Sequence, residues 1–126
     1  MQVLGGSALQ VIVPAACAGS FLIHRQLASF AVALFWTGES ITDVAVYMAD
    51  AKTRTLPLLG GDGVIHDWNY LLGGVGLLNW AGGLATLTFG VGMLIILAAL
   101  GILVVDLRAA WTRASAGGQA ETWRQP

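Results

Sequence analysis

Three carboxylates and a tyrosine interrupt an apolar run that would otherwise suit the interior of a membrane. The run begins at Leu27, and the polar groups within it are Glu39, Asp43, Tyr47 and Asp50. On a helix that advances about 100° per residue, Asp43 lies about 40° from Glu39, Tyr47 about 80° and Asp50 about 20°. The four side chains form one polar stripe, here named the acidic stripe. An Asp at mid-bilayer costs roughly 2.5 to 3.5 kcal/mol, so such groups normally face protein or water and serve a function.

The chemistry open to the acidic stripe depends on what its carboxylates meet. No Lys or Arg lies at the depth of Glu39 and Asp43, so no ion-pair partner stands within the spans. The two groups are then protonated, bind a cation, line water, or meet polar groups from the connector that follows. Two carboxylates one turn apart share a proton or a metal readily. The alternative is that Glu39 only supports helix packing while Asp50 lies at the membrane surface beside Lys52.

A second candidate site is the pair His66-Asp67. Imidazole is the commonest metal ligand, and a neighbouring carboxylate can bind the metal or orient the ring. A zinc site needs at least three protein ligands, and Glu39 and Asp43 complete such a set if the connector folds back on the stripe. The alternative is an ordinary hydrogen-bonded histidine at the membrane surface. His24, beside Arg25, is typical of a turn.

Catalytic motifs are absent from the sequence. It contains no His-Glu-x-x-His, Gly-x-Ser-x-Gly, Cys-x-x-Cys or Walker pattern, and its two histidines, His24 and His66, are too far apart to form a zinc pair on one helix. We therefore assign no catalytic residue.

Composition places these residues in a membrane protein. The chain has 126 residues, of which 56% are hydrophobic and 10% charged, and its mean hydropathy is +0.74. Soluble domains are usually about 25% charged. A net charge of −1 gives no support to nucleic-acid binding. The single cysteine, Cys17, excludes an internal disulfide.

Hydropathy predicts an all-α membrane protein with about three transmembrane helices in a single domain, 1–111. Stretches of about 20 apolar residues span a bilayer. The predicted spans are 5–23, 27–51 and 83–105, with an interfacial or re-entrant connector over 52–82 and a disordered tail over 112–126. Small residues on one side of the third span, Gly82, Thr86 and Gly90, are typical of close helix packing.

The distribution of basic residues favours one orientation. Cytoplasmic loops carry an excess of Lys and Arg. Four arginines lie on one predicted side of the membrane and Lys52 and Arg54 on the other. This favours an outside amino terminus and a cytoplasmic carboxyl terminus, and the four arginines are Arg25, Arg108, Arg113 and Arg124.

Several segments together resemble a family of bacterial membrane proteins. The segments are 4–10, 35–44, 49–51, 56–61 and 66–72. They are similar to uncharacterised proteins that look like site-2-protease-type intramembrane zinc metallopeptidases. The resemblance implies the bacterial inner membrane, zinc as a cofactor, and a third zinc ligand at Asp43 or Asp67. In that family a preceding helix carries His-Glu-x-x-His, which supplies two ligands and the general base. This chain lacks that helix, so we expect it to be inactive alone, being either shortened, completed by a partner, or non-catalytic.

Three hypotheses for function follow. The first is a protein resembling the carboxyl-terminal part of such a metallopeptidase, with the acidic stripe lining a polar or metal-binding cavity. The second is a small oligomeric subunit that relays cations or protons through Glu39 and Asp43. It requires self-association through the small-residue faces, which are Ala15/Gly19 and Gly82/Thr86/Gly90. The third is a structural assembly subunit of a membrane complex. The expected partners are the bilayer and either further copies or another membrane subunit.

Overall fold

Three long helices make up most of the part of the chain that the structure describes. A computed structural model describes residues 2–50, 73–76 and 78–122. In chain order the elements are α1 (Gln2–Ile23), α2 (Leu27–Asp50), the short 3-10 helix η1 (Leu78–Trp80) and α4 (Ala81–Thr122). The described residues contain no strand. The predicted all-α class with three long helices is confirmed, and the predicted connector lies largely outside the described residues.

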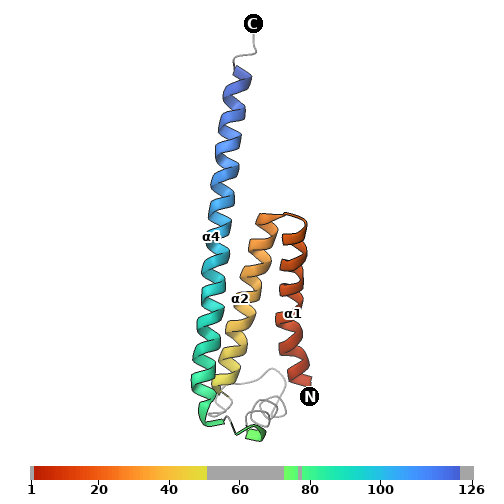
Figure 1. The fold of residues 1–126 in the computed structure, drawn as a ribbon, viewed down its shortest axis with the longest axis vertical. Coiled ribbons are helices and arrows are strands. Elements are labelled where there is room, and N and C mark those ends of the chain that lie inside the picture. Colours follow the sequence, from red (N-terminus) through yellow and green to blue (C-terminus); the bar gives the residue numbers. More distant parts are fainter. Residues whose placement is uncertain (1, 51–72, 77, 123–126) are drawn as a thin grey trace.

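A tight turn joins α1 to α2. The amide of Gln26 donates to the carbonyl of Phe21 at 2.9 Å, and that of Arg25 donates to Leu22 at 3.1 Å. These two bonds form a Schellman motif, which requires a left-handed residue just after the helix. Arg25 occupies that position with φ of 56°. With only three residues between the helices, α1 and α2 must run antiparallel side by side (Figure 1).

Helix α2 is the centre of an open layer of helices. It lies between α1 and α4 (Figure 1), packs most extensively against α4, and contacts α1 along its other side. Helices α1 and α4 have at most marginal contact with each other. Three helices side by side do not enclose a core, so each exposes a broad apolar surface, and most large hydrophobic side chains of the described residues are exposed.

The contact between α2 and α4 follows a coiled-coil spacing. The buried and half-buried positions of α2 recur at alternating steps of three and four residues, as do those of α4. This 3.5-residue period is typical of two helices that cross at a shallow angle of about 20°. The positions are Ala31, Leu34, Gly38, Ile41, Ala45 and Met48 on α2, and Ala81, Ala85, Thr88, Gly92, Ile95, Ala99 and Ile102 on α4.

The two backbones touch where Gly38 meets Gly92. A Cβ atom added to Gly38 would lie 2.9 Å from the carbonyl oxygen of Gly92. One added to Gly92 would lie 2.9 Å from the carbonyl oxygen of Gly38 and 2.6 Å from Cγ2 of Thr42. Only residues without a Cβ allow so close an approach. Gly82, Thr86 and Gly90, whose spacing is typical of close helix packing, do not take part in the contact with α2, because all three are exposed.

Two of the helices are long and apolar enough to cross a membrane. They are 6–23, with a mean hydropathy of 1.7, and 81–117, with 2.7. Only 11% of either apolar segment is buried within the protein, whereas the core helix of a soluble domain would be largely covered. Helix α2 lacks this property because Glu39 and Asp43 interrupt its apolar sequence.

Helix α4 is longer than the sequence predicts. The third span was expected over 83–105 and a disordered tail over 112–126, yet α4 continues without a break to Thr122. At 1.5 Å per residue, its 42 residues extend about 63 Å. The segment beyond the span is rich in alanine, the best helix former. Hydroxyl groups there bond to the preceding turn, for example Ser115 Oγ to the carbonyl of Trp111 at 2.9 Å. Local propensity therefore sustains the helix where hydropathy falls.

Candidate functional site

The candidate site lies on the side of α2 that turns towards α1. A groove of about 530 Å³ between the two helices is lined by Cys17 and Phe21 of α1 and by Ser29, Ala33 and Trp36 of α2, among others. Ser29, Ala33 and Trp36 are spaced by three or four residues along α2. Further steps of four and three residues lead to Ser40 and Asp43, which therefore lie on the same side of the helix. The α1-facing side of α2 therefore changes from apolar, near the turn, to polar towards Asp50.

Gln10 of α1 meets the acidic stripe. Its Nε2 atom donates a hydrogen bond to Oδ2 of Asp43 at 3.2 Å. Pro14, one turn later, is fully buried and has no amide hydrogen, so the carbonyl of Gln10 lacks its usual partner within the helix. Gln10 thus brings two polar groups to the level of Asp43: its side-chain amide, and a backbone carbonyl that has no amide partner at Pro14. A carboxylate that accepts such a bond is held in one orientation.

Glu39 lies in a different environment from Asp43. A step of 100° per residue puts Glu39 about 80° from the centre of the α1-facing side and still further from the α4-facing side. Its side chain is exposed, as is that of Asp43, but only Asp43 accepts the bond from Gln10. Within the described part of the chain, no hydrogen bond or ion pair reaches its carboxyl group. The acidic stripe is therefore divided, with Asp43 held by α1 while Glu39 stands on an uncovered surface.

Among the residues whose side chains the structure describes, this uncovered surface is mostly apolar around Glu39. We name it the open face of α2, and its exposed fractions are 61% for Val32, 38% for Phe35 and 46% for Val46. Tyr47 also lies on the stripe side of α2. The Tyr47 side chain is 43% exposed. The carboxyl group of Glu39 thus stands among exposed aliphatic and aromatic side chains.

Glu39 is close to the middle of the apolar part of the molecule. It follows Gly38, which packs against Gly92. Gly92 is almost central in the stretch 81–105 of α4, which contains no charged residue. In a bilayer that covers this stretch, the open face of α2 is at mid-depth.

A metal site is not assembled by the residues that the structure describes. No group of three His, Cys, Asp or Glu side chains in these ranges is arranged to hold a metal ion. Glu39 and Asp43 are two of the four predicted ligands, and the other two, His66 and Asp67, lie outside the described residues. The zinc hypothesis therefore stays a prediction.

The small-residue faces expected for self-association are open. The exposed positions of α1 include Ala15 and Gly19, and those of α4 include Gly82 and Gly90. A Cβ added to any of these three glycines would meet no atom within 4 Å. None of these faces is used between the described helices.

Gln10 is the site residue that sequence reasoning did not identify. The length of the turn between α1 and α2 could have predicted that Gln10 lies close to Asp43. Three residues between antiparallel helices pair positions whose numbers sum to about 50, which puts Gln10 within one turn of Asp43. An uncharged amide carries no chemical signal in the sequence comparable to that of an ionisable group.

Comparison with known proteins yields no match for this chain among family models, curated proteins or solved structures.

Proposed function

We propose that this chain is an integral membrane subunit whose open face of α2 contacts a further membrane segment. That segment belongs to a second copy or to a partner protein. One observation carries the proposal, namely the exposed carboxyl group of Glu39 near mid-depth on an otherwise apolar surface.

The physical reason is the high free energy of a carboxyl group in lipid. At the centre of a helix, an acidic residue facing hydrocarbon is unfavourable by roughly 2.5 to 3.5 kcal/mol. Asp43 is relieved of part of this cost by its bond from Gln10. No equivalent bond within the described residues relieves Glu39. A covering segment with a hydrogen-bond donor at this depth would satisfy Glu39 and bury Val32, Phe35 and Val46 as well.

Site-specific photo-crosslinking tests the proposal. A photoreactive side chain at Val46 on the open face should form a crosslink to one protein of defined size in membranes. The matched control is Leu87 of α4, which is 70% exposed and lies at a similar depth. We expect Glu39→Leu to abolish the Val46 crosslink and Glu39→Gln, which retains hydrogen bonding, to keep most of it. Crosslinks only to lipid at both positions would refute the proposal. Two differently tagged copies identify a self-crosslink.

A second candidate function is a proton or cation relay within an oligomer. The arrangement that favours it is the Gln10–Asp43 hydrogen bond one helical turn from the exposed Glu39. A carboxyl group with one oriented neighbour can exchange a proton with it through a single water molecule. Proteoliposomes containing the protein should then show a flux that Glu39→Gln abolishes. No flux at any pH would count against this function.

The resemblance to intramembrane metallopeptidases suggests that the covering segment supplies zinc ligands. A helix bearing His-Glu-x-x-His, seated on the open face of α2, would bring two imidazoles to the level of Asp43. Asp43 would then serve as third zinc ligand, with Gln10 orienting its carboxylate as ligating carboxylates commonly are. The chain alone is expected to hydrolyse no peptide. Zinc retained equally by wild type, Asp43→Ala and His66→Ala would remove zinc from the proposal.

A further inference from the structure

A second groove lies between the start of α2 and the part of α4 that runs past it. Its volume is about 490 Å³, within the range of ligand pockets, roughly 300–1,000 Å³. It exists because α2 begins at Leu27 whereas α4 continues (Figure 1), leaving one side of α4 uncovered. The lining residues are Leu27, Ala98, Gly101, Ile102, Val105, Asp106, Ala109 and Arg113.

The groove is long, and its lining is apolar over most of its length. It extends along α4 from Ala98 to Arg113, about 22 Å at 1.5 Å per residue. Small residues hollow it, and a Cβ added to Gly101 would meet no atom within 4 Å. An extended hydrocarbon chain matches this length and this apolar lining.

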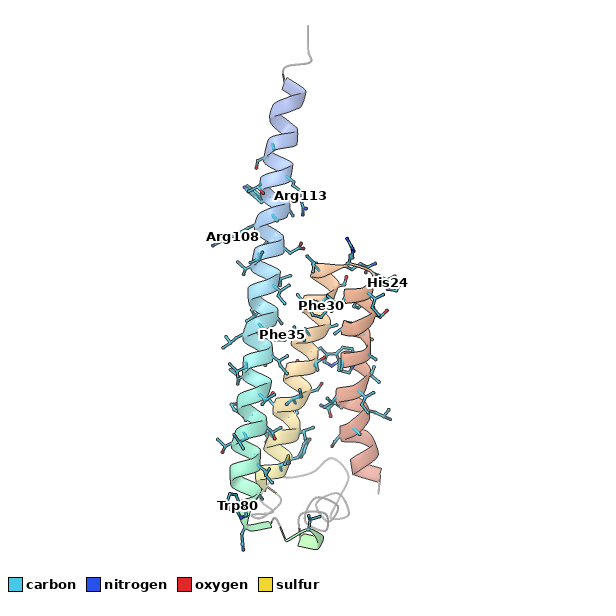
Figure 2. All side chains as sticks on the ribbon, in the orientation of Figure 1. His24, Phe30, Phe35, Trp80, Arg108 and Arg113 are labelled. Atoms are coloured by element: carbon cyan, nitrogen blue, oxygen red, sulfur yellow. The ribbon has the colours of Figure 1, made fainter. Side chains whose placement is uncertain are left out.

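One of the lining residues at the outer end of the groove is basic. Arg113 lines the groove. Arg108 lies on the opposite side of α4 from Arg113 (Figure 2). The single acid of the lining, Asp106, is two turns below Arg113, about 10 Å along the axis.

This charged end belongs at the level of lipid headgroups. Trp80 and Trp111 are 70% and 76% exposed, and the chain between them extends about 46 Å as a helix. That length matches a bilayer with its headgroup layers, about 40–45 Å, whose surfaces are where exposed tryptophans concentrate. Arg113 is half a turn beyond Trp111, and its long side chain points back towards the membrane, as helical side chains do.

We propose that this groove binds one anionic phospholipid, with its phosphate against Arg113 and an acyl chain along Ala98, Gly101 and Val105. The groove has the same order of polar and apolar parts as the lipid, and guanidinium groups bind phosphate by two parallel hydrogen bonds. Basic pockets between membrane helices recognise anionic headgroups in this way. The inference uses the membrane placement of the proposed function but not the open face of α2, so lipid binding and the Val46 crosslink can fail separately.

Native mass spectrometry of the purified full chain tests the proposal. The protein is titrated in detergent with phosphatidylglycerol, with phosphatidylcholine of the same chains, and with glycerol phosphate as a headgroup without chains. We expect one phosphatidylglycerol bound at saturation, at least fivefold tighter than phosphatidylcholine, and no binding of glycerol phosphate. Equal affinity for the two lipids, or binding of glycerol phosphate alone, would overturn the proposal.

Two pairs of variants locate the site. Arg113→Gln should weaken phosphatidylglycerol binding about fivefold, the effect of one basic residue at a membrane surface, while Arg108→Gln should change it less than twofold. Gly101→Leu should fill the groove and weaken binding about tenfold or more through steric exclusion. Its control is Gly90→Leu, on an exposed part of α4 outside the groove.

The two perturbations act on different ends of the lipid, so they are independent. Circular dichroism establishes that each variant retains its helices, and a variant that loses them is replaced by Arg113→Lys or Gly101→Val. Equal losses for Arg113→Gln and Arg108→Gln would reveal a general charge effect and overturn the site. Unchanged binding by the Gly101 variants would do the same.

Discussion

Replacing Gly92 by alanine should force α2 and α4 apart at their closest point. The added Cβ would lie 2.6 Å from Cγ2 of Thr42, 2.9 Å from the carbonyl oxygen of Gly38 and 3.1 Å from the amide nitrogen of Thr42. Two of these three atoms belong to the backbone of α2. No side-chain rotation can relieve those contacts, so the whole helix must shift.

The expected magnitude comes from two opposing effects. An overpacked methyl group in a tight contact typically destabilises a protein by about 1–3 kcal/mol. Alanine also has a higher helix propensity than glycine by about 1 kcal/mol. Gly90→Ala, two residues earlier in α4, provides the second effect without the first, because its Cβ would meet no atom within 4 Å. The free energies of unfolding of the two variants should therefore differ by about 1–3 kcal/mol.

The measurement is unfolding in mixed micelles of a mild detergent and dodecyl sulfate. Fluorescent labels on cysteines introduced at Val46 and Leu87, in a Cys17→Ala background, report the separation of α2 and α4. Gly92→Ala should unfold at a lower fraction of dodecyl sulfate than Gly90→Ala and should show weaker energy transfer beforehand. Gly38→Ala should behave like Gly92→Ala, since its Cβ would lie 2.9 Å from the carbonyl oxygen of Gly92.

The double variant provides a further check. Once one methyl group has separated the helices, the second has more room, so Gly38→Ala with Gly92→Ala should destabilise less than the sum of the two single effects. If Gly92→Ala is as stable as Gly90→Ala, the two glycines are not in contact, and the proposed crossing of α2 and α4 is wrong.

Three further predictions concern the turn, the site and the topology. Gln10→Leu removes the hydrogen bond to Asp43 and should lower the free energy of unfolding by about 0.6 kcal/mol, the average for such bonds between membrane helices. Asp43→Asn keeps an acceptor and should be nearly neutral in the same assay. Equal losses in the two variants would contradict the assignment of this bond. Arg25→Gly should be about 1 kcal/mol more stable than Arg25→Ala, because only glycine adopts the left-handed φ of 56° without a steric cost; equal stabilities would contradict the turn geometry. In sealed vesicles, cysteines at Arg25 and Ser115 should react with an impermeant maleimide from one side and a cysteine at Val75 from the other, and a different pattern would exclude the proposed membrane placement.

Much of the helical structure was predictable because it depends on local features. Uncharged runs of about 20 residues indicated the spans, and His24-Arg25-Gln26 left room only for a tight turn between antiparallel helices. The length of α4 was not predicted, because the expectation for 112–126 followed hydropathy while alanine content and hydroxyl bonds within the turn decide helix formation there. Propensity and hydropathy are separate properties, and they diverge at the membrane surface.

The contacts between helices were less predictable. Gly82, Thr86 and Gly90 put small residues on one face of α4, and Ala85 and Gly92 put small residues on another. The sequence of α4 alone does not show which of the two faces packs against α2. The choice depends on which face of α2 offers a matching series. Gly38 matches Gly92, and no local pattern within either helix contains that information.

The sequence by itself determined three helices, their tight first turn, and a row of acids along one side of the second. Only the tertiary structure decided that this row is divided, with Asp43 bonded to Gln10 and Glu39 left on the open face of α2. The physical reason is that helix formation depends on residues within a few positions of one another, whereas the surroundings of a side chain depend on which face its helix turns to its neighbours. Two acids one turn apart can therefore have the same sequence context and different surroundings.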